Sequence, residues 1–196
     1  TESMWITSKR HPFSMKVKLG ANRDGKLTAY WTDFTLCHGA YTSAGQYILR
    51  RALYMLSGCY NIPAVDALGR LVYTNDAWGG AARGAGPPQA NFALESAMEL
   101  MAGRLGMDPL DFRLLNSLKP GESISTGQVI EEWPFPGCLE ALRPHYERAR
   151  REAADFKEGR YRRGVGIAGG SFGIGRGGAD RSHVAVELKP DGGLTV

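Results

Sequence analysis

The sequence predicts a mixed α+β chain in which short strands and hairpins pack with helices. Residues 16–36 alternate polar and apolar side chains on both sides of Asp24-Gly25, which is the pattern of a β-hairpin. Residues 88–105 instead carry apolar side chains at helical spacing, and residues 136–156 form a charged segment that opens on a proline. Strand and helix signals thus occur together within 196 residues, and they indicate an α+β fold.

The expected strands lie mainly in the first half of the chain. We expect a hairpin formed by residues 16–21 and 26–36, a short apolar segment at 44–56, and a strand at 70–74. Gly25 supplies the positive φ that the hairpin turn needs. Residues 184–196 repeat the hairpin pattern around Asp191-Gly192-Gly193, which hints at two related modules.

Three helices are expected in the second half, at 88–105, 109–118 and 136–156. Gly106 ends the first, and Asp108 caps the second. Pro144 should kink or divide the third. The first helix has five apolar side chains available for burial: Phe92, Leu94, Met98, Met101 and Leu105. Residues 162–172 are predicted to form a buried strand that enters a glycine-rich turn.

Composition and charge exclude several classes of protein. With 43% apolar and 22% charged residues, the chain resembles a soluble globular protein. No apolar run approaches the ~20 residues that a membrane helix needs. The net charge is +4, and the seven arginines between residues 143 and 163 alternate with acidic residues, which favours a solvated helix face over a nucleic-acid surface. The chain lacks an initiator methionine and ends in an expected strand, so both ends read as internal cuts.

Three other patterns give weak functional signals. Residues 173–178 match GxGxxG, but an alternating strand rather than a helix follows, so we expect a flexible glycine-rich connection there and no dinucleotide site. The four histidines show no metal-ligand spacing, and the three cysteines are too scattered for a disulfide framework or a zinc site. The histidines are therefore interpreted as ordinary structural or surface residues, and the three cysteines as buried thiols.

The stretch from Gly79 to Leu100 gives a stronger signal. Arg83 stands among glycines just before a helix, and Gly84 and Gly86 would let the main chain approach a ligand closely. Pro87-Pro88 stiffen the entry to the helix. The free amides of the first helical turn, together with Arg83, would make an anion-receptive site. A plain helix-start loop is the alternative interpretation.

Several blocks in fixed order resemble the molybdenum-binding subunit of the xanthine dehydrogenase and aldehyde oxidoreductase family. The resemblance covers essentially the whole chain, and the ordered set of blocks is more specific than any one of them. The blocks are Ser8-Lys-Arg-His-Pro-Phe13, Arg51-Ala-Leu-Tyr54, Arg83-Gly-Ala-Gly-Pro-Pro-Gln89, Gly106-Met-Asp-Pro-Leu-Asp-Phe-Arg113 and the helix stop from Asn116 to Gly121.

The resemblance implies parts of two related molybdopterin-binding domains: residues 1–121 would be the C-terminal part of the first, and residues 122–196 the N-terminal part of the second. It also implies that Arg83, Gly84 and Gly86 bind the molybdenum cofactor, either plain or in its cytosine dinucleotide form. No residue of the chain is expected to ligate the metal or to act as the catalytic base, and Glu95 and Glu99 are interpreted as structural. The expected substrate-channel residues are Ala44, Tyr47, Ile48, Arg51 and Ala85.

For the intact protein the resemblance implies a molybdenum hydroxylase that oxidises an aldehyde or an N-heterocycle with oxygen from water. In purine-oxidising members the position of Ala85 carries an aromatic side chain, so alanine there makes purines less favoured substrates. Electrons would pass to iron–sulfur and flavin groups on other domains or subunits of an oligomer. We expect no nucleic-acid or membrane partner, and a cytoplasmic or, alternatively, periplasmic location. The chain alone is expected to be inactive. A non-catalytic interaction or scaffolding domain is the competing hypothesis.

Overall fold

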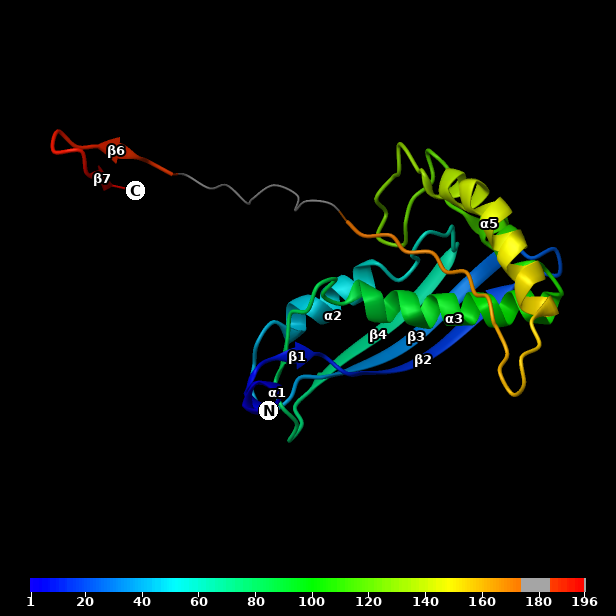
Figure 1. Ribbon diagram of the computed structural model, residues 1–196, viewed down its shortest axis with the longest axis horizontal. Coiled ribbons are helices and arrows are strands. Elements are labelled where there is room, and N and C mark those ends of the chain that lie inside the picture. Colours follow the sequence, from blue (N-terminus) through cyan, green and yellow to red (C-terminus); the bar gives the residue numbers. More distant parts are fainter. Residues whose placement is uncertain (174–183, 196) are drawn as a thin grey trace.

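A three-stranded sheet forms the centre of the molecule. The structure is a computed structural model that describes residues 1–173 and 184–195. The strands β2 (Phe13–Ala21), β3 (Leu27–Cys37) and β4 (Ala64–Val72) lie in that order across the sheet (Figure 1). β2 and β3 run antiparallel as the predicted hairpin, whereas β3 and β4 run parallel. The predicted α+β fold is therefore confirmed.

The hairpin turn is fixed from within and from a distant helix. Within the turn, the Asn22 side chain accepts a hydrogen bond from the Lys26 amide at 2.8 Å, and Gly25 has the expected positive φ of 84°. The Asn116 side chain, at the end of α4 (Pro109–Asn116), donates to the Gly25 carbonyl and accepts from the Leu27 amide. The turn is thereby anchored to a segment about ninety residues farther along the chain.

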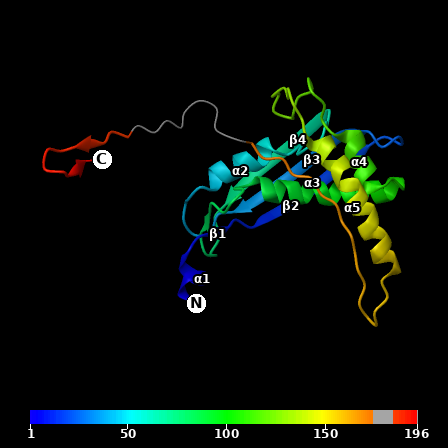
Figure 2. The same ribbon diagram turned by 45° about the horizontal axis from the view of Figure 1, so that its top comes forward.

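Two helices cover the same face of the sheet. α2 (Gly45–Tyr54) packs on β4, α3 (Pro87–Leu105) packs on β2, and the two helices contact each other (Figure 2). β3 alternates between its two faces, and the side chains that point toward the helices are buried: Tyr30, Thr32, Phe34 and Leu36. The main core therefore lies between the sheet and this helix pair.

The buried side of α3 follows a four-residue spacing through Ala90, Leu94, Met98 and Ala102. Phe92 lies on the opposite side of the helix and is 69% exposed, so its predicted burial is wrong. Gly106 ends the helix in the left-handed conformation, with a φ of 67°, as predicted.

α4 and α5 form the remaining helical layer. Asp108 caps α4 by accepting hydrogen bonds from the Leu110 and Asp111 amides, as expected. α5 (Phe135–Asp155) packs on α4 and continues through Pro144, which does not divide it. Leu139 and Tyr146 are buried on either side of that proline, so packing holds the two halves as one helix.

The short elements complete the description. A parallel two-residue pair joins β1 (Lys9–Arg10) to β5 (Gly79–Gly80), and α1 spans Glu2–Ile6. Near the C-terminus, β6 (Glu187–Leu188) and β7 (Leu194–Thr195) form the second predicted hairpin. Across residues 1–173 and 184–195, none of the helices combines the length and the apolar composition that crossing a bilayer requires.

Two strand predictions differ from the structure. β4 begins at Ala64, six residues before the predicted start, and ends at Val72. Residues 162–172 form no strand, and among them only Ile167 is buried, because the glycines of this stretch offer little side-chain surface to pack. The segment instead runs alongside α3 (Figure 1). The GxGxxG motif, apart from Gly173, lies outside the described residues.

Candidate functional site

The loop from Arg83 to Gln89 packs closely against α2. A turn forms where the Ala85 amide donates to the Ala82 carbonyl at 2.8 Å, and Gly84 and Gly86 have φ values of 101° and 109°. A Cβ on Gly86 would lie 2.3 Å from the Ile48 carbonyl oxygen. The bare backbone at Gly86 therefore allows close contact between the loop and α2.

The first turn of α3 does not offer the free amides that the sequence argument expected. Pro87 and Pro88 have no N–H, and the amides of Gln89 and Ala90 both donate to the Gly86 carbonyl. The anion-receptive helix terminus is thus wrong as a mechanism. Attraction for an anion at this loop therefore cannot come from the first helical turn, and side chains can supply it.

Two guanidinium groups supply that positive charge. Arg83, the first residue of the loop, is exposed. Arg10 reaches it from β1, because the β1–β5 pairing places that strand beside the start of the loop, and its Nη2 donates to the Arg83 carbonyl at 2.6 Å. Arg10 thus stabilises the loop backbone and adds a second cation next to Arg83.

The five predicted channel residues separate into two groups. Ile48 is 1% exposed and belongs to an apolar cluster with Leu36 and Leu49, against which Ala44 and Ala85 pack. Tyr47 and Arg51 instead lie together on the more exposed side of α2, where the Arg51 Nη1 donates to the Tyr47 hydroxyl at 2.8 Å. The Arg51 guanidinium also lies 4.5 Å from the centre of the Phe172 ring.

Ala85 itself has an unusual backbone conformation. Among the described residues it alone, apart from glycines, has a positive φ, of 38°. A side chain with a Cβ rarely occupies this region, so the neighbouring contacts must hold it there. The backbone conformation at Ala85 therefore limits which side chains this position can accept, in addition to any limit that a substrate sets.

Next to the loop lies a buried pair of histidines that sequence reasoning interpreted as ordinary. His11 and His38 are 2% and 0% exposed, and 3.3 Å separates the His11 Nε2 from the His38 Nδ1. The register of the predicted hairpin could have indicated that these two histidines lie opposite each other. Phe13 pairs with Leu36, so extending the register by two residues places His11 opposite His38.

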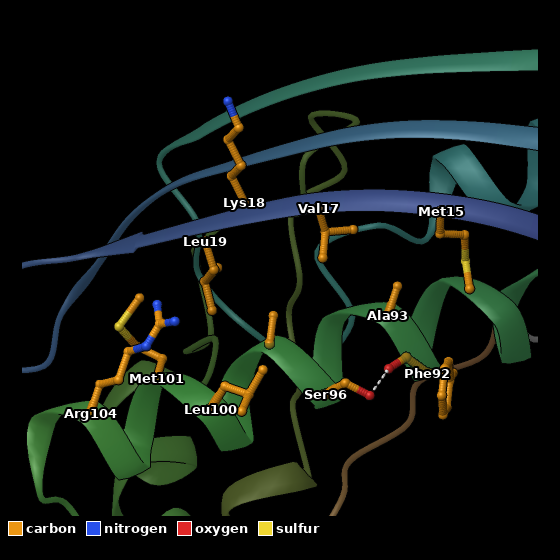
Figure 3. A pocket seen from close by; sticks show the side chains of 11 residues that line it. Met15, Val17, Lys18, Leu19, Phe92, Ala93, Ser96, Leu100, Met101 and Arg104 are labelled. Carbon is orange, nitrogen blue, oxygen red and sulfur yellow. Dashed lines mark hydrogen bonds between the residues drawn. The ribbon is translucent and has the colours of Figure 1, made fainter.

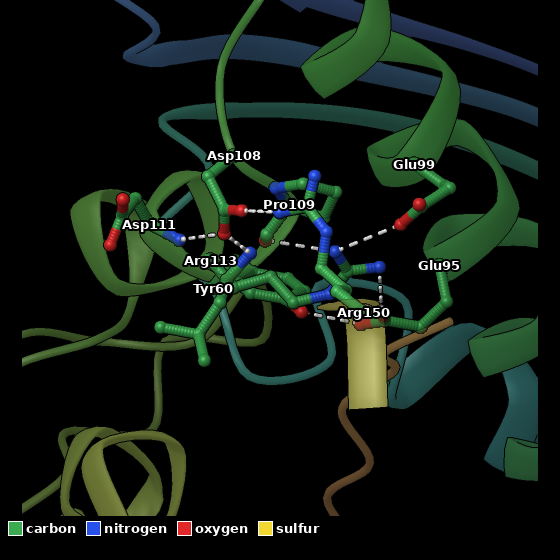
Figure 4. Close-up of polar contacts among 9 residues, drawn as sticks. Tyr60, Glu95, Glu99, Asp108, Pro109, Asp111, Arg113 and Arg150 are labelled. Atoms are coloured by element: carbon green, nitrogen blue, oxygen red, sulfur yellow. Dashed lines mark hydrogen bonds and ion pairs between the residues drawn. The ribbon is translucent and has the colours of Figure 1, made fainter. Parts of the chain in front are cut away.

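Glu95 and Glu99 have structural contacts, as predicted. The fully buried Arg113 donates to Glu95 through its Nε at 2.9 Å and to Glu99 through its Nη1 at 3.2 Å, and the Tyr60 hydroxyl also donates to Glu95 (Figure 4). Burial and the nearby Glu95 carboxylate raise the pKa of Tyr60 above its ordinary value. These hydrogen bonds connect α3 to α4. Within the described part of the chain, no group of three or more His, Cys, Asp and Glu side chains could hold a metal ion.

A groove of about 460 Å³ lies elsewhere, between β2 and α3 (Figure 3). Its floor includes Met15 and Val17 from β2, and Phe92 and Leu100 stand exposed on α3. None of its lining residues belongs to the Arg83 loop, so we do not assign it to the candidate site.

Comparison with known proteins identifies relatives across nearly the whole chain. The aldehyde oxidoreductase of Megalodesulfovibrio gigas is 41% identical over 190 residues, which cover 97% of this chain and 21% of that protein. The nicotinate dehydrogenase large molybdopterin subunit of Eubacterium barkeri is 41% identical over 154 residues, which cover 79% of this chain and 35% of that subunit. The chain thus spans about a fifth to a third of the length of these relatives.

The fold agrees with a solved structure of the same kind. The aldehyde oxidoreductase from Desulfovibrio gigas superimposes with a TM-score of 0.86 at 40% identity, covering 95% of this chain and 21% of that one. A family model described as the molybdopterin cofactor-binding domain matches residues 1–117. The chain therefore belongs to the family of molybdopterin cofactor-binding domains.

Proposed function

We propose that the chain forms one wall of the cofactor site of a molybdenum hydroxylase that oxidises an aldehyde or an N-heterocycle. The observation that carries this proposal is the Arg83–Gln89 loop, which Gly86 allows to pack against α2 and which combines the exposed Arg83 with Arg10, bound from β1 to the Arg83 carbonyl. Membership of the molybdopterin cofactor-binding family and the match to an aldehyde oxidoreductase support it.

The residues of the loop fit a polar, anionic cofactor. Arg83 has an exposed guanidinium, and Arg10 adds positive charge beside it. Gln89, in the first turn of α3, has a buried side-chain oxygen without a hydrogen-bond partner among the described residues. Buried oxygens of this kind normally have a partner, so a donor from a bound group would satisfy it. We propose that these three side chains, with the backbone at Gly84 and Gly86, hold the cofactor.

The molybdenum cofactor, when bound, supplies the redox chemistry and the oxygen atom derived from water. The chain's own side chains bind and orient. We propose that Tyr47 and Arg51 face the substrate, because they form a hydrogen-bonded pair on the more exposed side of α2. Ala44, Ile48 and Ala85 form the apolar support behind them.

Substrate preference follows from Ala85. An aromatic side chain at that position could stack on a purine, and alanine removes that contact, worth on the order of 1 kcal/mol. We therefore predict that the intact enzyme oxidises aldehydes or smaller heterocycles with a higher kcat/KM than xanthine. A substrate panel on the purified enzyme measures this, and xanthine as the best substrate would contradict it.

The remaining parts of the proposal concern the intact protein. Electrons would leave through iron–sulfur clusters and a flavin on other domains or subunits, in an oligomer without nucleic-acid or membrane partners. The division into two domains near residues 121 and 122 stays a prediction, as does a cytoplasmic, or alternatively periplasmic, location. The chain alone, with a single cofactor loop and no catalytic base, is proposed to be inactive.

The test is the molybdenum content of the intact protein with Arg83→Ala. We expect bound molybdenum to fall severalfold while folding is unchanged, because Arg83 is exposed. Arg104→Ala is the matched control, since Arg104 is also an exposed arginine but lies in the last turn of α3.

Equal molybdenum in both variants would contradict the role of Arg83. An intact wild-type protein that takes up no molybdenum, in a host that makes the cofactor, would instead support the non-catalytic scaffolding role.

A further inference from the structure

The histidine pair has the geometry of a direct hydrogen bond between two imidazoles. The ring planes differ by 19°, and the ring centres are 5.5 Å apart while the facing nitrogens are 3.3 Å apart. The rings therefore meet edge to edge, with a nitrogen of one directed at a nitrogen of the other. One nitrogen must carry a hydrogen, and the other must offer a lone pair.

The surrounding contacts decide which tautomer each ring adopts. The Ser43 backbone N–H donates to the His38 Nε2 at 3.2 Å, so that nitrogen must be unprotonated. A neutral His38 then carries its hydrogen on Nδ1 and donates it to the His11 Nε2. His11 in turn carries its hydrogen on Nδ1, a buried atom that has no hydrogen-bond partner of normal geometry among the described residues.

The pair connects every segment of the candidate site. His11 directly follows Arg10, and its backbone carbonyl accepts a hydrogen bond from the Gln89 side chain. The His38 carbonyl accepts from the Gly79 amide at 2.9 Å, just before the loop. Through Ser43, the same ring reaches the segment that leads into α2. Gly79 has no Cβ to keep the His11 ring away, since a Cβ there would lie 2.4 Å from the ring.

We propose that His11 and His38 are a positioning pair that keeps the Arg83 loop aligned with α2 while both imidazoles are neutral, and that one added proton releases the loop. A proton on the His38 Nε2 removes its hydrogen bond with Ser43. A proton on the His11 Nε2 places two N–H groups against each other. Either site of protonation therefore costs one of the contacts that join the segments. The consequence for the cofactor rests on the proposed function, but the tautomers and the acid response do not.

The surroundings favour the neutral form. Burial lowers the pKa of His11, the adjacent His38 lowers it further, and the Gly80 backbone partly opposes both. Arg10 and Cys37 adjoin the two histidines in sequence, on β1 and β3, and the Tyr73 ring centre lies 5.6 Å from that of His38. Among the described residues neither imidazole forms an ion pair with a carboxylate, and the hydrogen-bond partner of the His11 Nε2 is the second imidazole.

The sign of the pH dependence follows. The unfolded chain binds a proton at His11 more readily than the folded chain does, so the stability contributed by the neutral ring is complete above the ordinary pKa of histidine, about 6.5. It is lost as the pH falls below that value. The loop should therefore loosen in mild acid and tighten again when the pH is restored.

Two measurements on the cofactor-free chain test the pair. In histidine-labelled protein at pH 7.5, correlation spectra between ring nitrogens and carbon-bound hydrogens should show the Nδ1–H tautomer for both residues. Hydrogen-exchange protection of the Gly79 amide, corrected for intrinsic exchange, should fall by about tenfold per pH unit between about pH 6.5 and the lowered pKa of the folded pair, which is the slope for one linked proton, and should level off below that pKa. The Asn22 amide in the hairpin turn is the internal reference and should keep its protection.

Three variants separate positioning from simple space filling. His11→Gln keeps an acceptor for the His38 Nδ1–H and should preserve the protection of Gly79 at pH 7.5, whereas His11→Leu fills similar space without an acceptor and should lose it. His145→Gln, at an exposed histidine on α5, should keep the wild-type acid response.

An Nε2–H tautomer at His38, equal protection in the Gln and Leu variants, or an acid response shared by the Asn22 amide would overturn the proposal. None of these measurements involves molybdenum. If the histidine pair behaves as expected but the intact protein takes up no molybdenum, the proposed function is refuted while the positioning pair stands.

Discussion

At the scale of single residues, Arg113 is a charged side chain that lies entirely inside the molecule. Its guanidinium is fully buried, and Glu95, Glu99 and the Pro109 carbonyl accept its hydrogens. The net gain from burying such an ion pair is small, but removing one partner leaves the other charge desolvated and unpaired. Arg113 therefore matters more for what its loss would expose than for the bond energy it adds.

We predict that Arg113→Met lowers the free energy of unfolding by about 3–5 kcal/mol. The physical reason is that Glu95, which is 8% exposed, would lose its counter-charge. Urea unfolding followed by circular dichroism measures the loss. Arg143→Met is the control, because Arg143 pairs with Asp111 and Glu140 on the surface, where the pair is screened, so little change is expected. Equal effects in the two variants would contradict the argument.

At the scale of elements, the contact between the loop and α2 depends on one missing side chain. Gly86 is the N-cap residue just before α3, with a φ of 109°, and it lies against the Ile48 and Ala52 backbone. Backbone cannot move aside as a flexible side chain can. The contact at Gly86 therefore fixes how closely the start of α3 approaches α2.

We predict that Gly86→Ala destabilises the chain by at least 1–3 kcal/mol, roughly the cost of the backbone conformation alone. Gly103→Ala, in the interior of the same helix, should instead stabilise it by about 0.5–1 kcal/mol, because nothing lies within 4 Å of the added Cβ. Thermal unfolding of both variants tests the pair of predictions. A tolerated alanine at Gly86 would show that the loop is not fixed on α2.

Local signals predicted the elements whose structure depends on neighbours in sequence. Asp24-Gly25 predicted the turn, Asp108 predicted the start of α4, and Gly106 predicted the end of α3. The prediction of a strand over 162–172 was wrong because apolar residues separated by glycines give the same short pattern whether or not a strand partner exists.

At the scale of the whole molecule, the candidate site depends on strand pairing between segments that are far apart in the sequence, which local motifs do not reveal. Arg10 and His11 reach the loop only because β1 pairs with β5, some seventy residues away in sequence. The Arg83 block could be recognised from its residues, yet its predicted helix amides were wrong, since Pro87 and Pro88 have none to donate. The binding role of that loop stays a prediction, which the Arg83→Ala experiment tests.

The anchoring of the hairpin turn by Asn116 has a consequence for the chain during synthesis. The hairpin can close as soon as β3 has left the ribosome, but Asn116 follows Gly25 by 91 positions. At 5–20 residues per second, roughly 5–20 s pass before that anchor is made. The face of the hairpin that α3 later covers stays open to other apolar surfaces until α3 has been made, and the turn lacks its Asn116 anchor until α4 follows.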